Sequence, residues 1–425
     1  MKGTMKEKNN IPYRIWTGIV IGAFSGIVIC SYRFFMKLCD DALNQYILPF
    51  LHEGSRLRVL LWAFVVVVLA YIVHRLIRFE PAAKGGGIPH AIQETAGTSD
   101  ARWWSVIISK ITAAPLCNLA GLSLGKTGPA VELGAMSGKG AGIILHKLAK
   151  KKTDPAVCSF HGCAAGLAAL FNAPLAGMWF ASEKLHKKDG LSGMTTLISA
   201  FVAAGISIAV FGYTPIVDIA LPVHDWRLYA NVTILAIFLG VLGVFYDKSL
   251  SFVTGILSDK RISQLVLWIA VFLISGSIQY FAPALTGGGS NMLAVMTEST
   301  TLRLLVLLLT GKYLFSMLSS GSGLPGGTVF PLLTVGACIG QIFGTLTNIL
   351  FPSLGISPVT FILPGMAGFF SSVLGAPLTG MFLLCEFSCN YNNLPPLLVV
   401  CVLSGLISRK LRNVSPYRTV RRHNE

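Results

Sequence analysis

The sequence predicts an all-α integral membrane protein built from two inverted-topology repeats of tilted and broken helices. Three observations lead to this fold class. Of the 425 residues, 53% are hydrophobic and only 12% are charged, and the mean hydropathy is +0.67. Several apolar runs reach the length of about 20 residues that a helix needs to cross a bilayer. Two stretches about 200 residues apart share one pattern, and glycine and proline interrupt the apolar runs in both halves.

This composition excludes an ordinary soluble domain, in which about 25% of the residues are charged. The formal charge of +16 would suit a nucleic-acid-binding protein, but the lysines and arginines lie in short loops and at the chain ends. Positive-inside topology accounts for that distribution, so we expect no nucleic-acid partner and both termini on the cytoplasmic side. The polar start "MKGTMKEKNN" lacks a cleavage site, so we expect no removable signal peptide.

The elements are expected in the following order within a single membrane domain, residues 1–425. An N-terminal helix over 11–38 contains the run "GIVIGAFSGIVIC". Repeat 1 covers about 57–212 and contains "VLLWAFVVVVLAYIV", whereas repeat 2 covers about 263–408 and contains "LLVLLLTGKYLF" and "LPPLLVVCVLSGLI". A basic cytoplasmic tail follows over 409–425. The nine cysteines mostly fall within apolar runs, so no disulfide framework is predicted.

The internal repeat rests on two matches at nearly the same offset. The pattern Ala-Pro-Leu-x-Gly-Met occurs at 173–178 and at 376–381, and Glu183 and Glu386 follow it at the same offset of 203. "KGGGIP" at 84–89 corresponds to "TGGGSN" at 286–291, at an offset of 202. Doubled halves with interrupted helices indicate a transporter whose site lies between the repeats.

Four interruptions of the apolar runs are candidates for that site. They are "KGGGIP" (84–89), "GKTGP" (125–129), "GSGLPGGTVFP" (321–331) and "SPYRTV" (415–420). Non-helical backbone at membrane depth is tolerated only where protein or a water-filled cavity satisfies it. Pro129 suits the first turn of a new helix, and the free amides at such a helix start attract an anion.

Other chemistries fit these residues less well. "GKT" resembles the end of a phosphate-binding loop, but that motif needs a glycine at position 120, which is alanine. An intramembrane serine hydrolase would need a histidine partner for Ser322, and His423 in the polar tail is the only histidine after it. No paired acids or metal-ligand spacing occur, so we expect no enzyme activity, no bound metal and no cofactor. A non-conducting membrane scaffold remains an alternative.

Taken in order, the motifs Gly-x-Gly-Ile-Pro, Gly-x-x-Gly-Pro, "FNAPLAG", "GSGLPGG", "GAPLTG" and Pro-x-Tyr resemble the CLC family of chloride channels and proton-coupled chloride exchangers. The match covers nearly the whole chain. The resemblance implies CLC architecture: a homodimer in the lipid bilayer, with one pore in each subunit, that moves chloride or similar small anions. It also implies a bacterial inner membrane, and because the sequence ends soon after Tyr417 we expect none of the cytoplasmic regulatory domains of many eukaryotic members.

Four segments would line the anion path if the family's pattern is carried over. Tyr417 would offer its hydroxyl from the cytoplasmic side. The remaining anion-binding residues would be Gly85, Gly86, Gly87, Ile88 and Pro89 in the inner segment, Lys126, Thr127 and Gly128 in the outer segment, and Gly327, Thr328 and Val329 in a central clasp.

Three positions bear on mechanism. Thr127 stands where the family commonly has the glutamate that gates the path and carries protons, and Lys184 stands at the inner proton-relay position. Threonine has no proton that titrates in the usable range. The sequence therefore predicts a passive, uncoupled chloride-type channel. A proton-coupled exchanger of chloride or fluoride, in which Glu132 or another acid replaces the missing carboxylate, is the main alternative.

Overall fold

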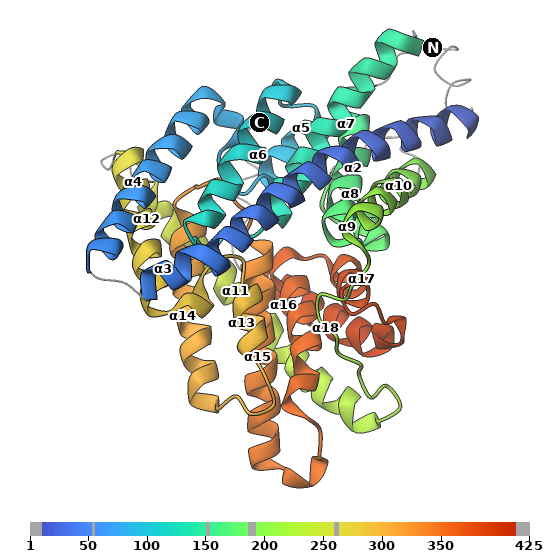
Figure 1. The fold of residues 1–425 in the computed structure, drawn as a ribbon. Coiled ribbons are helices and arrows are strands. Elements are labelled where there is room, and N and C mark those ends of the chain that lie inside the picture. The colour runs from blue at the N-terminus through green and yellow to red at the C-terminus, as the bar shows by residue number, and fades with distance from the viewer. Residues whose placement is uncertain (1–10, 53–55, 150–153, 186–192, 259–262, 414–425) are drawn as a thin grey trace.

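The computed structural model describes residues 11–52, 56–149, 154–185, 193–258 and 263–413. Over these residues the chain forms helices joined by short turns, with one isolated bridge between two residues as its only extended pairing. The all-α fold class is therefore confirmed. Figure 1 shows helix α2 (Ile11–Ala42) running diagonally across one face of the helical body.

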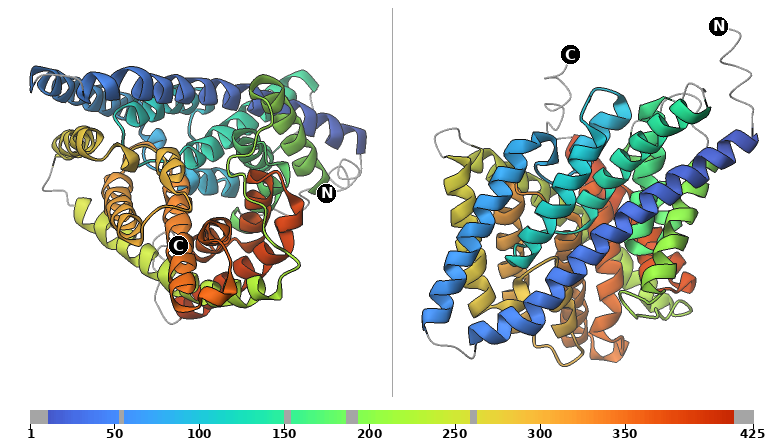
Figure 2. Two further views of the ribbon diagram at one scale, coloured as in Figure 1. Left: turned by 60° about the horizontal axis from the view of Figure 1, so that its bottom comes forward. Right: turned by 45° about the horizontal axis from the view of Figure 1, so that its top comes forward.

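The N-terminal helix is longer than the predicted range 11–38. From α2 the chain passes through a π turn, η1 (Leu43–Ile47), into α3 (Leu48–His52) without leaving the helical state. Residues 31–48 contain neither glycine nor proline, so no residue there breaks the helix. In the left view of Figure 2 this helix lies along one edge of the molecule.

From α4 onward the same order of elements occurs twice, with α11 (Trp226–Leu257) between the two halves. The first half contains α4 (Arg56–Phe79), η2 (Pro81–Ala83), α5 (Ile88–Ala96), α6 (Trp103–Leu119), α7 (Thr127–Ala149), α8 (Pro155–Phe171), α9 (Pro174–Lys184) and α10 (Gly193–Phe211). The second half contains α12 (Gln264–Phe281), η3 (Pro283–Leu285), α13 (Ser290–Val295), α14 (Leu302–Gly321), α15 (Val329–Leu350), η4 (Pro352–Leu354), η5 (Pro358–Phe361), α16 (Ile362–Leu374), α17 (Pro377–Phe387), η6 (Tyr391–Asn393) and α18 (Leu394–Asn413).

Eight helical stretches in the described residues are long and apolar enough to cross a membrane. Others, among them α5, α9, α13 and α17, are too short to do so. The long helices expose large apolar side chains on their outer faces, as a lipid environment requires; Phe64, Phe238, Phe252 and Leu307 are each more than half exposed. The chain is an integral membrane protein.

Glycines let the central helices approach backbone to backbone in both halves. A Cβ atom on Gly138 of α7 would lie 2.1 Å from the Cys158 carbonyl oxygen of α8. In the second half, a Cβ atom on Gly340 of α15 would lie 2.0 Å from the Phe361 carbonyl oxygen just before α16. Small residues at such contacts are typical of helix packing in membranes. The backbones of α7 and α8, and of α15 and the segment before α16, therefore approach closely in both repeats.

Two glutamates show how the repeats face each other. Glu183, in the last turn of α9, accepts hydrogen bonds of 3.0 and 2.9 Å from the N–H groups of the second and third residues of α17. Glu386, in the last turn of α17, accepts bonds of 3.0 and 2.9 Å from the equivalent N–H groups of α9. Each helix therefore ends beside the start of the other. This reciprocal arrangement is what inverted repeats produce.

Replacing Glu183 with alanine should lower the free energy of unfolding by about 1–2 kcal/mol, because the first turn of α17 loses its hydrogen-bond acceptor. Chemical unfolding of the detergent-solubilised protein measures this difference. Ser182→Ala is the control, since that exposed hydroxyl bonds only to the Met178 carbonyl of its own helix. Equal stability of Glu183→Ala and the parent would contradict the capping role.

Candidate functional site: an anion-binding junction

Three of the four predicted interruptions meet in one place, and the fourth, 415–420, lies outside the described residues. The segments 125–129 and 321–331 are paired backbone to backbone. The N–H group of Gly125 donates to the Gly327 carbonyl at 2.5 Å, and the N–H group of Gly327 donates to the Gly125 carbonyl at 2.7 Å. Segments about 200 positions apart in the sequence thus satisfy each other's polar groups at membrane depth.

The inner glycine segment joins this pair from the other side. The Gly85 N–H group donates to the Gly323 carbonyl at 3.2 Å, and the Gly326 N–H group donates to the Gly85 carbonyl at 3.3 Å. The segment 323–327 is therefore held between the other two. We call the three segments, residues 85–89, 125–129 and 323–331, the junction.

The junction leaves no room for side chains at its centre. A Cβ atom on Gly128 would lie 1.9 Å from the Gly86 carbonyl oxygen and 3.1 Å from the Gly327 Cα atom. Gly87 has a φ of +85°, and a Cβ atom there would lie 2.7 Å from the Gly128 carbonyl oxygen. Only glycine permits such contact between backbones.

Three helices begin at the junction. Helix α5 starts at Ile88 and Pro89, α7 starts at Thr127, and α15 starts at Val329, whose side chain is fully buried. Neither Gly87 nor Thr328, the N-cap residues of α5 and α15, provides a side-chain cap. The first N–H groups of a helix have no partner within it, and its dipole places partial positive charge at that end. The converging helix starts therefore make this junction a candidate site for an anion.

Thr127 adds a side-chain donor to this site. Its side chain is 1% exposed, and its Oγ1 atom is buried without a hydrogen-bond partner among the described residues. A buried hydroxyl without a partner is costly and calls for an explanation. A small anion at the start of α7 would accept this hydrogen bond together with the neighbouring amides.

The Lys126 side chain lines a cavity of about 270 Å³ together with Arg33, Lys37 and Phe330. Its Nζ atom lies 2.6 Å from the Asp40 Oδ2 atom. Asp40 also accepts a hydrogen bond of 2.6 Å from the Asn118 side chain. The Asp40 carboxylate therefore offsets part of the positive charge of the lysines and arginine that line this cavity. No sequence motif indicated Asp40.

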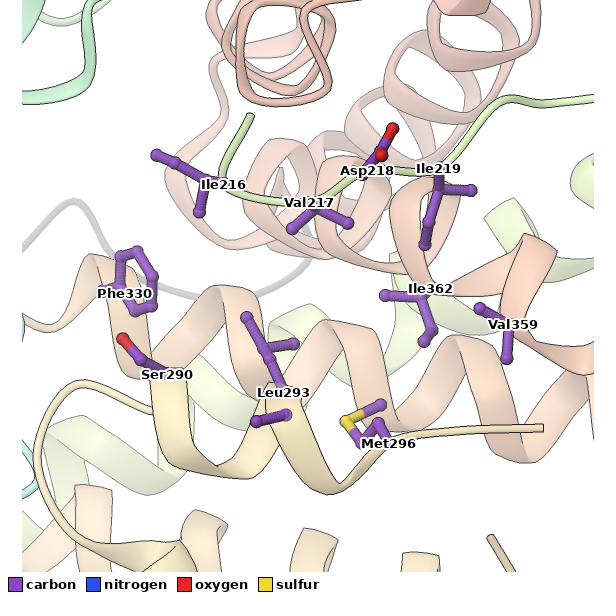
Figure 3. A pocket seen from close by; sticks show the side chains of 11 residues that line it. Ile216, Val217, Asp218, Ile219, Ser290, Leu293, Met296, Phe330, Val359 and Ile362 are labelled. Atoms are coloured by element: carbon purple, nitrogen blue, oxygen red, sulfur yellow. The ribbon is translucent and has the colours of Figure 1, made fainter. Parts of the chain in front are cut away.

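A second cavity, of about 390 Å³, adjoins the first and shares Phe330, Ile216 and Ser290 with it. Figure 3 shows Phe330 at one end of this cavity, with Val217 and Ile219 facing Leu293 and Ile362 across it. Phe330 directly follows Val329 of the central clasp. Both cavities border the junction at Phe330; the first has charged as well as apolar lining residues, and the second is lined mainly by apolar residues.

Glu132 lies behind the junction and is fully buried. Its Oε2 atom is 2.7 Å from the Lys110 Nζ atom, and its Oε1 atom is 2.6 Å from the His90 Nδ1 atom. Lys110 also donates to the carbonyl oxygens of Ala83 and Gly85, both at 2.8 Å. Glu132 is thus held within an ion-paired cluster beside the inner glycine segment, away from the open start of α7.

The lysine of this cluster has a counterpart in the second half. Lys312 donates to the carbonyl oxygens of Leu285 at 2.9 Å and Gly287 at 2.7 Å. Thr334 packs against Gly289 where Glu132 packs against Gly87. A buried lysine that fixes a glycine segment is therefore common to both repeats, whereas the carboxylate belongs to the first. The two lysines stand at the same distance along the sequence from their glycine motifs, so the sequence itself contains a signal for this pair.

The family profile described as voltage gated chloride channel matches residues 65–409. The chain belongs to the CLC family. It is 30% identical over 409 residues to the H(+)/Cl(-) exchange transporter ClcA of Vibrio parahaemolyticus, covering 92% of this chain and 85% of that protein. It is 29% identical over 420 residues to the ClcA of Vibrio cholerae (strain ATCC 39315), covering 95% and 88%.

Solved structures agree with this membership. A slow cyanobacterial Cl-/H+ antiporter matches with a TM-score of 0.86 at 25% identity, over 97% of this chain and 99% of that one. A CLC-type fluoride/proton antiporter matches with a TM-score of 0.74 at 20% identity, over 94% and 96%, and shows the fold alone. The fold is CLC architecture, and the function of the protein is anion transport.

In this CLC protein, the cluster around Glu132 extends to α5, which is too short to cross a bilayer. The Nε2 atom of His90 is 3.5 Å from the Glu94 Oε1 atom, and Lys139 donates to the Glu94 Oε2 atom at 2.9 Å. Burial alone lowers the pKa of His90, but the bonds to Glu132 and Glu94 outweigh it and raise the pKa to about 9. The two carboxylates therefore favour the protonated form of His90.

Lys184, which the sequence predicts at the inner proton-relay position, donates from its ammonium group to the carbonyl oxygen of Leu374 at the end of α16. The lysine therefore interacts with the negative end of a helix dipole. Tyr417, predicted to reach the anion from the cytoplasmic side, lies outside the described residues.

Gly128→Ala should reduce anion flux at least about tenfold, because the added methyl group would force the inner and outer segments apart. Flux from chloride-loaded proteoliposomes measures the effect. Gly255→Ala, on an exposed face of α11 with open space around the added atom, is the control. Normal flux in Gly128→Ala, with the protein still folded, would place the anion path elsewhere.

His90→Gln should flatten the dependence of stability on pH. A histidine with a raised pKa stabilises the fold fully below its unfolded pKa of about 6.5, and this contribution disappears as the pH rises through about 9. The parent should therefore lose about 2 kcal/mol more than the variant between pH 6.5 and 9.5. His52→Gln changes an exposed histidine and should keep the parental slope. Parallel curves for the parent and His90→Gln would exclude the ion-paired histidine.

Proposed function

We propose that this protein conducts chloride-type anions through the junction without coupling them to protons. The observation that carries the proposal is the buried, unpartnered hydroxyl of Thr127 at the meeting point of three helix starts. Hydroxyl and amide donors bind an anion directly, and neither has a proton that titrates in the physiological range. The anion can therefore move while the protonation of the site stays constant.

The surroundings of the other candidate acid support the uncoupled mode. A proton carrier must reach the path when charged and leave it when neutral. Glu132 is fixed between Lys110 and His90, and leaving that position would strand a buried ammonium group. At the inner relay position, Lys184 offers no carboxylate to receive a proton from the cytoplasm.

Proton-coupled exchange is the second candidate, and the names of the related proteins favour it. The curated relatives are named H(+)/Cl(-) exchange transporters, and the cyanobacterial neighbour is a Cl-/H+ antiporter. In that mode Glu132, with His90 as its neighbour, would have to supply the proton that Thr127 lacks. The two candidates differ in one measurable quantity, the number of protons moved per anion.

We further propose that two copies act together in a bacterial inner membrane, each with its own path and with both termini in the cytoplasm. The basic segments 146–154 and 183–189 support this orientation through the positive-inside rule. Chloride is the anion that the names of the bacterial relatives suggest. Fluoride remains a second candidate because a fluoride/proton antiporter shares the fold. Competition of fluoride, nitrate and bromide with chloride in the same flux assay ranks the anions.

Thr127→Glu should convert the protein from a pH-insensitive to an acid-activated conductor. At neutral pH the new carboxylate competes with the anion for the helix amides, so flux should fall at least about tenfold. Toward pH 4.5 the carboxyl group protonates, since its reference pKa is about 4.3 and burial raises it, and flux should recover. Thr127→Gln is the matched control, because glutamine has nearly the same shape as glutamate but no charge. The flux through Thr127→Gln should stay independent of pH.

The same proteoliposomes separate the modes of transport. In the parent protein, a chloride gradient should drive no protons uphill, as a pH electrode in the outer solution reports. Uphill proton movement would establish exchange, and Glu132→Gln would then identify or exclude its carrier. A chloride-loaded vesicle with a potassium shunt that retains its chloride would leave only the scaffold alternative.

A further inference from the structure

One face of helix α12 carries three buried side chains that can donate hydrogen bonds. Trp268, Ser275 and Gln279 are fully buried, although α12 is an apolar helix long enough to cross the membrane, at one edge of the helical body beside α4 (Figure 1). Their spacing of seven and four residues places them on the same side of the helix. Buried polar groups inside a membrane protein need partners and call for an explanation.

Two of these side chains hydrogen-bond to the ends of two other helices. The Ser275 Oγ atom donates to the Ala120 carbonyl oxygen at 2.6 Å, at the end of α6. The Trp268 Nε1 atom donates to the Ser322 carbonyl oxygen at 2.9 Å, at the end of α14. The last carbonyl groups of a helix have no partner within it, and lipid cannot supply one. Helix α12 therefore satisfies backbone groups at both helix ends.

Gln279 adds a second contact to the end of α6. Its Nε2 atom donates to the Leu119 carbonyl oxygen at 3.2 Å, and its Oε1 atom accepts a hydrogen bond of 2.6 Å from the Trp62 Nε1 atom of α4. An indole N–H group only donates and a backbone carbonyl only accepts, so these two partners fix the orientation of the Gln279 amide. A Cβ atom on Gly121 would lie 2.4 Å from the Gln279 Nε2 atom. The end of α6 therefore packs directly on α12.

The two carbonyl groups that α12 holds are at equivalent positions of the two halves. Ala120 and Ser322 differ by 202 positions (322 − 120 = 202), which is the offset of the glycine motifs. Gly125 stands five positions after Ala120, and Gly327 stands five positions after Ser322. Helix α12 thus holds the same point of each broken helix, just ahead of the two glycines that pair at the junction.

Helix α4 has the place of α12 in the first half, but its side chains at these positions differ. At the offset of 202, the three positions of α12 correspond to three buried apolar residues of α4, which are Val66, Val73 and Ile77. The repeated scaffold itself therefore does not require polar groups at these positions. One helix of the second half holds a broken helix from each half, and this asymmetry indicates a role beyond the common fold.

We propose that Trp268, Ser275 and Gln279 are positioning residues that set the width of the anion path at the junction and thereby its selectivity among anions. A single helix that bonds to both carbonyl groups fixes the distance between the ends of α6 and α14. The segments after these ends lead to the starts of α7 and α15, so the same distance governs how closely those starts approach. The inference rests on the proposed passage of anions through the junction.

Loss of one of these bonds should loosen one broken helix without removing a donor that faces the anion. The free amides at the starts of α7 and α15 remain, so an anion can still bind there. The two segments of the junction can, however, move further apart. Nitrate is larger than chloride and gains more from a wider passage. The ratio of nitrate flux to chloride flux should therefore rise.

The test uses the full-length protein in proteoliposomes loaded with equal concentrations of chloride and nitrate. With a potassium shunt present, ion-selective electrodes measure the efflux of both anions from the same vesicles. Their ratio does not depend on how many copies are active, so a purely structural loss would leave it unchanged. Ser275→Ala should raise the nitrate-to-chloride ratio about threefold or more, the factor that corresponds to losing one hydrogen bond of modest net strength.

Ser277→Ala is the matched control, because it makes the same substitution on the same helix. The exposed Ser277 hydroxyl donates to the Leu273 carbonyl of α12 itself, and its removal should keep the parental ratio. Trp268→Phe removes the indole N–H group that holds the other broken helix, and it should shift the ratio in the same direction as Ser275→Ala.

Two results would overturn the inference. One is the parental ratio in both Ser275→Ala and Trp268→Phe, whether or not total flux falls; the other is an equal shift in Ser277→Ala. Failure of the proposed function looks different, because normal flux in Gly128→Ala would show that anions do not pass the junction. Reduced flux in Gly128→Ala together with unchanged ratios in the α12 variants would contradict the positioning role alone.

Discussion

The pairing of Gly125 with Gly327 is the constraint on which the rest of the structure depends. A broken helix in a membrane exposes backbone groups that lipid cannot satisfy. Here two breaks from different halves exchange two hydrogen bonds, and the inner glycine segment completes the set. Because the three breaks satisfy one another, the helices that follow must start at one point with their free amides together. The candidate anion site is thus a consequence of how the three segments satisfy one another's backbone N–H and C=O groups.

Interactions that occur in both halves of the chain stabilise this arrangement, and they lie outside the hydrogen bonds of the junction itself. Glu183 and Glu386 cap each other's helices, and Lys110 and Lys312 each hold the carbonyl groups of a glycine segment. These interactions are the same in both halves, so they belong to the scaffold. Glu132 breaks the symmetry, since Thr334 occupies its place in the second half. The first half therefore has a carboxylate paired with His90 beside its glycine segment. The second half has Thr334 in place of this carboxylate.

The charges of the side chains near the anion path determine how an anion interacts with this scaffold. At the gate position, a neutral hydroxyl faces the amides and leaves them free for the anion. At the inner position, Lys184 is directed to the end of α16, and with Arg409 and Arg412 it makes that edge of the molecule strongly positive. Neither Thr127 nor Lys184 carries a carboxylate that could bind a proton.

The sequence by itself determined the membrane class, the doubled halves and the identity of the three glycine breaks, because low charge, long apolar runs and repeated motifs are local properties of the chain. It placed the end of the N-terminal helix at residue 38, whereas the helical stretch continues to His52 because nothing in 39–48 interrupts it. Only the tertiary structure decided which groups neutralise which charges. Asp40 beside Lys126, Lys110 and His90 beside Glu132, and the α16 carbonyl beside Lys184 come from distant parts of the chain. Such partners depend on how helices pack, and no pattern within one segment records that packing.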